Sequence, residues 1–272
     1  MSEIKEVLSK NAFKFNKRYG QNFITDTNLL SAIVTDAGIT DGDTVLEIGP
    51  GAGTLTAELA KAAKKVIAYE IDENLSPVLA ETLADFPNAE VIFKDATKAT
   101  DEEIAEKTDG RYKLVANLPY YITTPVIMRF IESGNKPESI TVMVQKEVGD
   151  RLVAKAGSAE YGAITAAVAL EGEAKITRIV NRKMFYPVPN VDSCVVTITM
   201  NDRYEKDDKT KIKKLIRAAF AMRRKTLVNN LSSYFGMSKE SAANAVVNAG
   251  FSATVRGETL SVDDFVRLSK FI

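Results

Sequence analysis

The sequence contains no histidine among its 272 residues. This absence excludes the Ser-His-Asp and Cys-His arrangements of nucleophilic catalysis, the His-Glu-x-x-His zinc motif and any histidine acid or base. One cysteine, Cys194, without histidine cannot supply the four ligands of a zinc site, so no metal is expected. Any chemistry must therefore use carboxylates, amides, hydroxyls, backbone groups or a bound cosubstrate.

The sequence also lacks a second cysteine and a long apolar run, and we expect no secretory leader. A single cysteine cannot form an internal disulfide, which is typical of a reducing compartment. The longest apolar run, residues 163–170, is far shorter than the roughly 18 residues that a membrane span needs. The first six residues alternate in charge and contain no apolar core of a secretory signal. We therefore expect a cytoplasmic protein without membrane contact.

An ordinary composition, with 45% apolar and 26% charged residues, indicates a globular protein, and the length favours two domains. The net charge of zero hides a division. Residues 1–200 hold 22 basic and 28 acidic side chains, and residues 201–272 hold 14 and 8, so the two segments carry net charges of −6 and +6. We expect a first domain at 1–200, with a basic arm at 1–20, and a basic second domain at 201–272.

The positive charge of the second segment is concentrated in residues 209–225, which contain eight lysines and arginines and no acid. A solvated helix face is the simpler interpretation, but such a face usually carries interspersed acids. The run therefore favours binding of a polyanion.

Short apolar runs rich in β-branched residues alternate with helical stretches, which predicts a parallel α/β sheet covered on both faces. The predicted strands are residues 44–48, 65–70, 90–93, 113–117, 139–145, 174–180 and 194–200. The last two have no helix between them, so they should be antiparallel neighbours at one edge. Helices are predicted at 211–231, 239–249 and 262–268, after a polar linker at 201–210.

The first chemical motif is a glycine turn that follows the first predicted strand, with Gly49, Gly51 and Gly53 at alternate positions. Glycines permit positive φ and let a ligand approach the main chain. Glu70, at the end of the next strand, suits two ribose hydroxyls in either NAD or S-adenosylmethionine. The spacing differs from the Gly-x-Gly-x-x-Gly of dinucleotide sites, which favours S-adenosylmethionine over NAD or over a purely structural turn.

The second motif is Asn117-Leu118-Pro119-Tyr120, at the end of the fourth predicted strand. The Asn117 Oδ1 and the Leu118 carbonyl can accept the two protons of an exocyclic amine, while Tyr120 stacks on the ring. The alternative is an Asn-Pro turn with core tyrosines. Sheets of this type bind ligands at this edge, so an amine on a flat ring is the favoured substrate.

Five segments, residues 17–24, 47–53, 117–120, 185–193 and 220–227, resemble the ribosomal RNA adenine N6-dimethyltransferase family, and most closely its bacterial small-subunit branch. The resemblance extends from about residue 14 to the end of the chain. It implies a Rossmann-like class I methyltransferase fold with seven strands, the last of them antiparallel, and a small helical domain. It also implies transfer of four methyl groups from S-adenosylmethionine to two adjacent adenines near the 3′ end of 16S rRNA.

The resemblance also implies roles for particular residues. The cosubstrate site would comprise Asn22, Ile24, Gly49, Gly51, Glu70, Asp95 and Asn117. The catalytic site would comprise Asn117, Leu118, Pro119, Tyr120 and Phe185, with Phe185 facing Tyr120 across the target base, although an aromatic at this position can also be a core residue. The charge pattern, separately, predicts RNA phosphate contacts at Arg223, Arg224 and Lys225 and at Lys17 and Arg18 of the basic arm, with a solvated arm as the alternative for the last two.

Two positions depart from the family pattern: Ala156 replaces a common proline, and Tyr121 stands where some relatives have asparagine. Two other functions stay open. One is methylation of a single adenine of 23S rRNA, as in macrolide resistance. The other is a binding factor that keeps the fold and serves ribosome assembly or transcription. We expect a monomer that acts on the 30S subunit or its precursor.

Overall fold

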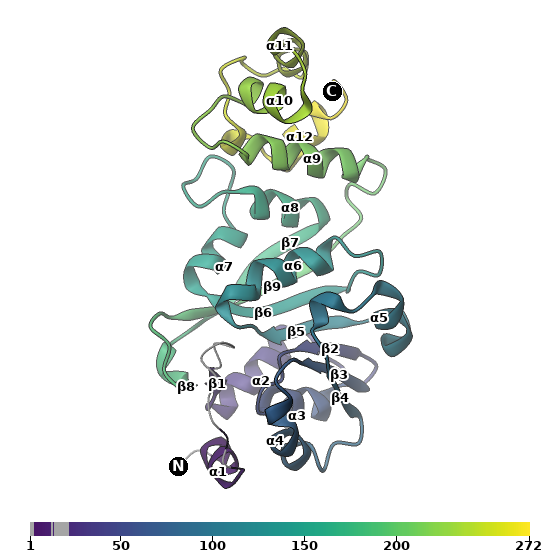
Figure 1. Ribbon diagram of the computed structural model, residues 1–272, viewed down its shortest axis with the longest axis vertical. Helices are drawn as coiled ribbons and strands as arrows, with labels where there is room; N and C mark the ends of the chain where they lie inside the picture. The colour runs from purple at the N-terminus through teal and green to yellow at the C-terminus, as the bar shows by residue number, and fades with distance from the viewer. Residues whose placement is uncertain (1–2, 12, 14–21) are drawn as a thin grey trace. The chain divides into compact units, whose positions relative to one another are not determined.

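The computed structural model describes residues 3–11, 13 and 22–272 and divides into two compact units (Figure 1). Unit 1 comprises Met1–Gly149 and Lys175–Met200, and unit 2 comprises Asp150–Ala174 and Asn201–Ile272. The chain leaves unit 1 for the last time after Met200, and the first domain expected from the sequence also ends at this residue. Residues 150–174, which the sequence assigns to the first domain, belong to unit 2.

Unit 1 is built on a seven-stranded sheet with the strand order β4-β3-β2-β5-β6-β9-β7. Its strands are β2 (Thr44–Ile48), β3 (Lys65–Glu70), β4 (Ala89–Phe93), β5 (Lys113–Asn117), β6 (Ser139–Gln145), β7 (Gly172–Val180) and β9 (Ser193–Met200). The pairs from β4 to β6 are parallel, whereas β9 runs antiparallel to β6. The predicted fold class and all seven predicted strands are confirmed.

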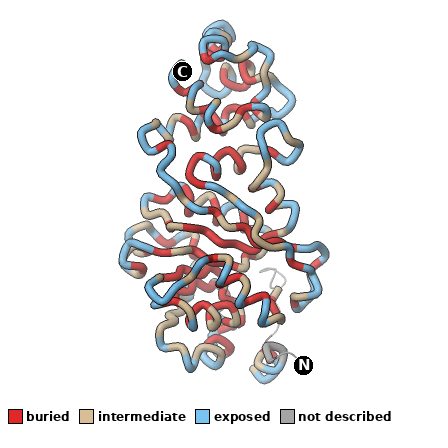
Figure 2. The backbone as a smooth tube through the Cα atoms, turned by 180° about the vertical axis from the view of Figure 1, so that it is seen from behind, coloured by how far each residue is buried: buried red, intermediate tan, exposed pale blue. Residues whose placement is uncertain are grey.

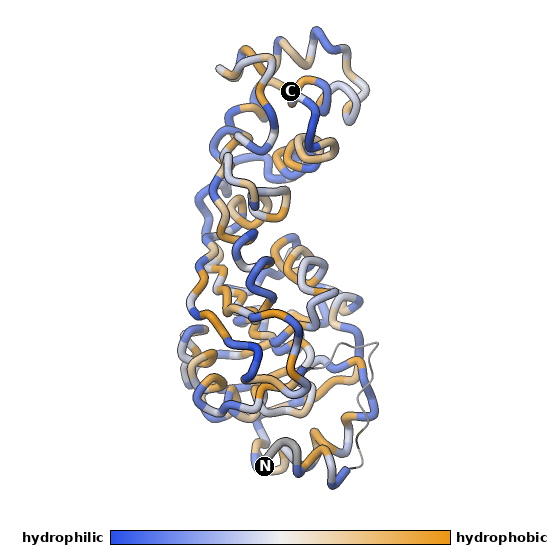
Figure 3. The backbone as a smooth tube through the Cα atoms, turned by 90° about the vertical axis from the view of Figure 1, so that its left-hand side faces the viewer, coloured by the Kyte–Doolittle hydropathy of each residue, from blue (hydrophilic) through white to orange (hydrophobic). Residues whose placement is uncertain are grey.

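The helices of unit 1 pack through apolar side chains against the sheet or against one another. They are α1 (Glu3–Lys10), α2 (Thr27–Asp36), α3 (Thr54–Ala62), α4 (Ser76–Thr82), α5 (Asp101–Thr108), α6 (Thr123–Ile131) and α7 (Lys146–Leu152), whose last residues lie in unit 2. One cluster joins Ile33 of α2 and Leu59 of α3 to Val45 and Val115 of the sheet. The central strands are buried and hydrophobic along their length (Figures 2 and 3).

A second sheet contains only β1 (Phe23–Ile24) and β8 (Phe185–Tyr186), which pair antiparallel. Strands of two residues leave no periodic pattern, and the sequence did not predict them. Their pairing brings the N-terminal segment beside the connection between β7 and β9, and both segments contribute to the site described below.

Unit 2 contains α8 (Ala163–Glu171), α9 (Lys209–Phe220), α10 (Leu227–Phe235), α11 (Lys239–Asn248) and α12 (Val262–Leu268) around its own apolar core. The prediction of one helix over 211–231 is wrong. The helix α9 ends at Phe220, and α10 starts again behind Thr226, whose hydroxyl accepts the Asn229 amide. The basic triplet at 223–225 therefore lies in the turn between two helices.

Candidate active site

A cavity of about 310 Å³ lies at the carboxyl edge of the parallel strands in unit 1. Its lining includes every described residue that the sequence assigns to the cosubstrate or catalytic site: Asn22, Ile24, Gly49, Gly51, Glu70, Asp95, Asn117, Leu118, Pro119, Tyr120 and Phe185. Strands β2, β3, β4 and β5 each end at this cavity. The parallel topology thus brings Glu70, Asp95 and Asn117 together, and the pairing of β1 with β8 adds the N-terminal segment and Phe185.

The glycine turn connects β2 to α3 and forms one wall of the cavity. Gly51 has a φ of +57°, and a Cβ atom there would lie 2.7 Å from the Phe23 ring. Both the backbone conformation and the close approach therefore require glycine at this position. Gly53 adopts a left-handed conformation at the N-cap of α3, so the turn passes directly into the helix.

Glu70 is held by the backbone on both of its carboxylate oxygens. Oε2 accepts the Gly51 amide at 3.0 Å, and Oε1 accepts the amides of Ile71 and Asp72 at 2.8 and 2.9 Å. Burial raises the pKa of Glu70, and these three amide donors oppose that shift. A carboxylate offers about four acceptor positions, so this arrangement fixes its orientation and leaves acceptor capacity for a ligand hydroxyl.

Two further carboxyl groups line the cavity. Asp95 follows β4, and its Oδ1 accepts the amide and hydroxyl of Thr97 at 3.0 and 2.7 Å. Glu47 lies in β2 and is 1% exposed, and burial raises its pKa to about 8. Glu47 is therefore mainly protonated at pH 7, whereas burial of the Asp95 carboxyl is outweighed by the hydrogen bonds from Thr97, which lower the pKa of Asp95.

Asn117 lies at the end of β5 and contacts the N-terminal segment. Its Nδ2 donates to the Asn22 carbonyl at 3.0 Å. This bond uses the donor side of the amide, so Oδ1 remains as the acceptor side. The side chain can therefore accept a hydrogen bond from an amine in the cavity, as the motif at the end of this strand predicts.

Two aromatic residues of the cavity differ in burial. Tyr120 is half-buried, and its hydroxyl is 3.0 Å from the Ser193 Oγ at the start of β9. Phe185 is 3% exposed and belongs to the apolar cluster of α2 and α3, although it also lines the cavity. The role of Phe185 in stacking stays a prediction.

Four contributors to the site were not predicted from the sequence. Ser193 anchors Tyr120, Phe23 packs beside Gly51, and Ile71 lines the cavity with 52% of its surface exposed. The fourth, Glu47, had a visible signal, because it is the one charged residue of the buried strand β2. The contributions of Ser193 and Phe23 depend on contacts between distant segments, which no local pattern reports.

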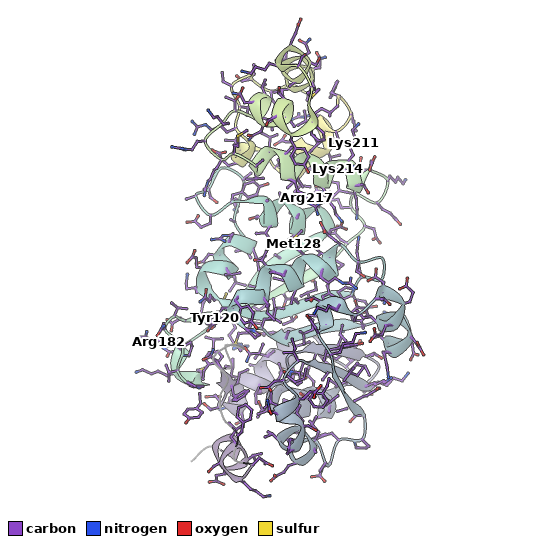
Figure 4. The ribbon with its side chains drawn as sticks, in the orientation of Figure 1. Tyr120, Met128, Arg182, Lys211, Lys214 and Arg217 are labelled. Atoms are coloured by element: carbon purple, nitrogen blue, oxygen red, sulfur yellow. The ribbon has the colours of Figure 1, made fainter. Side chains whose placement is uncertain are left out.

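In unit 2, the basic run divides into inward and outward side chains. Lys209 and Lys213 form ion pairs with the buried Glu171 at 3.0 and 2.7 Å, so these two lysines stabilise the contact between α8 and α9. Three further cations of the run, Lys211, Lys214 and Arg217, lie along α9 (Figure 4). The triplet of Arg223, Arg224 and Lys225 is exposed, and the Arg223 guanidinium donates to the Ala159 carbonyl at 2.6 Å.

Two predicted RNA contacts, Lys17 and Arg18, lie outside the described residues. Across residues 3–11, 13 and 22–272, no group of three or more Cys, Asp or Glu side chains is placed to hold a metal ion. Within the same part of the chain, no helix combines the length and the apolar character that a bilayer crossing requires.

Comparison with known proteins shows which family the chain belongs to. The model of the ribosomal RNA adenine dimethylase family matches residues 12–272. A ribosomal RNA small subunit methyltransferase A from Clostridioides difficile is 44% identical over 98% of this chain and 94% of its own length. A protein of the same name from Streptococcus sanguinis is 45% identical over 98% of this chain and 95% of its own.

Two solved structures are similar to this chain over most of its length. A dimethyladenosine transferase from Plasmodium falciparum has a TM-score of 0.77 and 27% identity, covering 90% of this chain and 95% of that one. The 23S rRNA methyltransferase ErmE shares the fold with a TM-score of 0.72 at 24% identity, over 92% of this chain and 98% of its own. The chain belongs to the ribosomal RNA adenine dimethylase family, and it is an enzyme that methylates adenine in ribosomal RNA.

Proposed function

We propose that the enzyme uses S-adenosylmethionine to dimethylate the N6 atoms of two adjacent adenines near the 3′ end of 16S rRNA, during assembly of the small subunit. The observation that carries this proposal is the convergence of all eleven described cosubstrate and catalytic residues on one cavity. The names of the relatives, which specify the small subunit, support the choice of RNA.

The cavity suits the cosubstrate in several respects. The glycine turn exposes main-chain atoms, and the Glu70 carboxylate is oriented to accept ribose hydroxyls. Asp95 and the exposed Ile71 lie where an adenine needs a polar edge and an apolar face. When bound, S-adenosylmethionine supplies a methyl group that is already activated by its sulfonium, so the protein needs no strong base.

The residues at the end of β5 orient the target amine. The Asn117 Oδ1 and the Leu118 carbonyl would accept hydrogen bonds from its two N–H groups, and Tyr120 and Phe185 would hold the ring between them. These contacts would direct the nitrogen lone pair towards the methyl group that the bound cosubstrate supplies, with the thioether as leaving group and the displaced proton released to solvent. Such catalysis depends on orientation and electrostatic preorganisation, which agrees with the absence of histidine.

In this proposal the two segments of the chain have different roles. Residues 1–200 bind the cosubstrate and transfer the methyl group, and residues 201–272 bind RNA. Arg223, Arg224 and Lys225, together with Lys17 and Arg18 of the N-terminal arm, contact phosphates. The enzyme acts in the cytoplasm as a monomer on the 30S subunit or its precursor.

The proposal is tested with undermethylated ribosomal subunits and labelled S-adenosylmethionine. Mass spectrometry of nuclease fragments should find N6,N6-dimethyladenosine at two neighbouring positions of 16S rRNA. One modified adenine in 23S rRNA would instead indicate the macrolide-resistance type of enzyme, and the absence of modification in both RNAs would favour a binding factor. Calorimetry should show saturable binding of S-adenosylmethionine, and binding of NAD alone would contradict the cosubstrate assignment.

A further inference from the structure

The connection between β7 and β9, residues 181–192, exposes three large hydrophobic side chains, Tyr186, Val188 and Val191. We call it the Pro loop, because Pro187 and Pro189 flank its most exposed apolar side chain, Val188. Val188 is 56% exposed, and Tyr186 and Val191 are 38% and 43% exposed. Apolar side chains gathered at the surface of one loop are typical of a contact site.

The Pro loop is continuous with the wall of the active-site cavity. Its strand β8 pairs with β1, and Phe185 of β8 lines the cavity. Successive residues of a strand face opposite sides, so Tyr186 faces outward where Phe185 faces inward. Val188 follows two residues later, and the loop projects from the side of the sheet beside β1 (Figure 1). The apolar surface thus starts at the edge of the target-base site.

Hydrogen bonds hold the Pro loop in shape. The Arg182 guanidinium donates to the Asn190 carbonyl at 2.8 Å, and the Arg182 amide donates to the Asp192 Oδ1 at 3.0 Å. The Lys146 amide, at the start of α7, donates to the Asp192 carbonyl at 3.0 Å. The two prolines restrict φ on both sides of Val188. Val188 is therefore presented by a preorganised backbone, which lowers the entropy cost of a contact.

The charges of the loop favour an anionic partner. Arg182 and Lys183 are both exposed, and Arg182 lies at the outer edge of unit 1 (Figure 4). The one acid of the loop, Asp192, accepts the Arg182 amide on Oδ1. A stack of RNA bases offers apolar faces bordered by phosphates, which matches an apolar tip bordered by cations.

We propose that Val188 is a wedge that enters the RNA base stack where the target adenine leaves it, while Arg182 and Lys183 contact the flanking phosphates. This inference rests on the proposed function, because methylation at N6 requires the adenine to be turned out of its stack. Unstacking a base is costly, and an apolar side chain that fills the vacated position offsets that cost. The wedge belongs to the same loop as Phe185, which lines the cavity that receives the base.

The test compares Val188→Ser, which removes the apolar surface, with Val188→Leu, which keeps it. Val191→Ser is the matched control, because it makes the same change at another exposed valine of the loop. Each full-length variant is mixed with a structured RNA that carries the fluorescent base 2-aminopurine at the target position. We expect Val188→Ser to lose the rise in fluorescence that reports the unstacked base, and Val188→Leu and Val191→Ser to keep it.

Methylation kinetics provide the second measurement. Val188→Ser should lower kcat/KM about tenfold on undermethylated small subunits, and it should leave the rate on a short single-stranded RNA with two adenines unchanged. Equal fluorescence and equal rates in wild type and Val188→Ser would overturn the wedge, as would an equal loss on both substrates. If the wild type itself transfers no methyl group to adenine in either RNA, the proposed function fails instead, so the two failures are distinguishable.

Discussion

The Asn117 amide joins β5 to the N-terminal segment through Nδ2, which donates to the Asn22 carbonyl. In the proposed mechanism its Oδ1 accepts a hydrogen bond from the substrate amine. Replacement by alanine removes both interactions, but the loss to the fold is one hydrogen bond, worth about 1 kcal/mol. We expect Asn117→Ala to reduce kcat by about 100-fold or more, as for other removed transition-state contacts. Thermal melting near the wild-type temperature would show an intact fold, and turnover near the wild-type rate would remove Asn117 from the mechanism.

Glu47 makes stability depend on pH in a defined direction. Burial raises its pKa from an ordinary value of 4.5 to about 8 in the folded chain. Between these values the unfolded chain binds fewer protons than the folded chain, so the free energy of unfolding falls as pH rises. The slope is at most on the order of 1 kcal/mol per pH unit.

Glu47→Gln keeps the shape of the side chain without the titration. We expect the stability of this variant relative to wild type to increase steadily from about pH 5 to pH 8, as measured by urea unfolding at each pH. A difference that stays constant over this range would show that Glu47 does not titrate between the two values.

The sequence predicts the polar residues of the site better than their partners. Asn117 and Glu70 each end a strand, and parallel strands end at the same edge, so their proximity follows from the pattern. The Ser193 hydroxyl that anchors Tyr120 lies 73 positions further along the chain. Such a contact depends on the order of strands in the sheet, which hydrophobic periodicity does not contain.

At the scale of elements, prediction succeeds where one pattern extends over a whole strand or helix. The strands β2 and β6 are short buried segments rich in β-branched residues, and their predicted bounds agree with the structure. The break between α9 and α10 was missed, because residues 221–226 contain good helix formers and no glycine or proline. The chain ends α9 there so that Leu227 and Leu231 of α10 enter the core of unit 2.

The contact between α7 and β9 can be tested at Gly149. A Cβ atom there would lie 2.1 Å from the Cys194 Sγ and 3.2 Å from the Val196 Cγ2. We expect Gly149→Ala to lower the free energy of unfolding by about 1–3 kcal/mol through overpacking, although alanine is the better helix former. Urea unfolding of Gly149→Ala, Cys194→Ala and the double variant measures the coupling.

The double variant should lose less free energy of unfolding than the two single variants lose in sum, because Cys194→Ala removes the nearer clash. Gly42→Ala is the matched control: the nearest atom to its Cβ would be 4.0 Å away, and its stability should change little. Strict additivity in the cycle would show that Cys194 does not limit the space at Gly149.

At the scale of the whole molecule, the net charge of zero combines two opposite contributions. Unit 2 as the structure defines it holds 16 basic and 12 acidic side chains, a net charge of +4, and unit 1 carries −4. The excess is smaller than the sequence boundary suggests, because residues 150–174 add two acids more than bases. Lys209 and Lys213 are paired with Glu171, so the proposed RNA contacts of this basic run use the exposed cations in the turn at 223–225 and Lys214 on α9.

The turn between α9 and α10 gives the last prediction. Arg223, Arg224 and Lys225 are all exposed, and no acid follows them before Glu240, so replacing all three with glutamine removes charge with little effect on packing. If they contact phosphates, the dependence of log K on log salt should flatten by about 0.7–0.9 for each lost contact, since fewer counterions are released on binding. Filter binding to small-subunit RNA at several salt concentrations measures this slope. The control replaces Lys239, Arg256 and Lys270, three exposed cations of the same unit, by glutamine. An equal slope in both triple variants would assign the effect to net charge alone, whereas a change confined to residues 223–225 would place the phosphates at this turn.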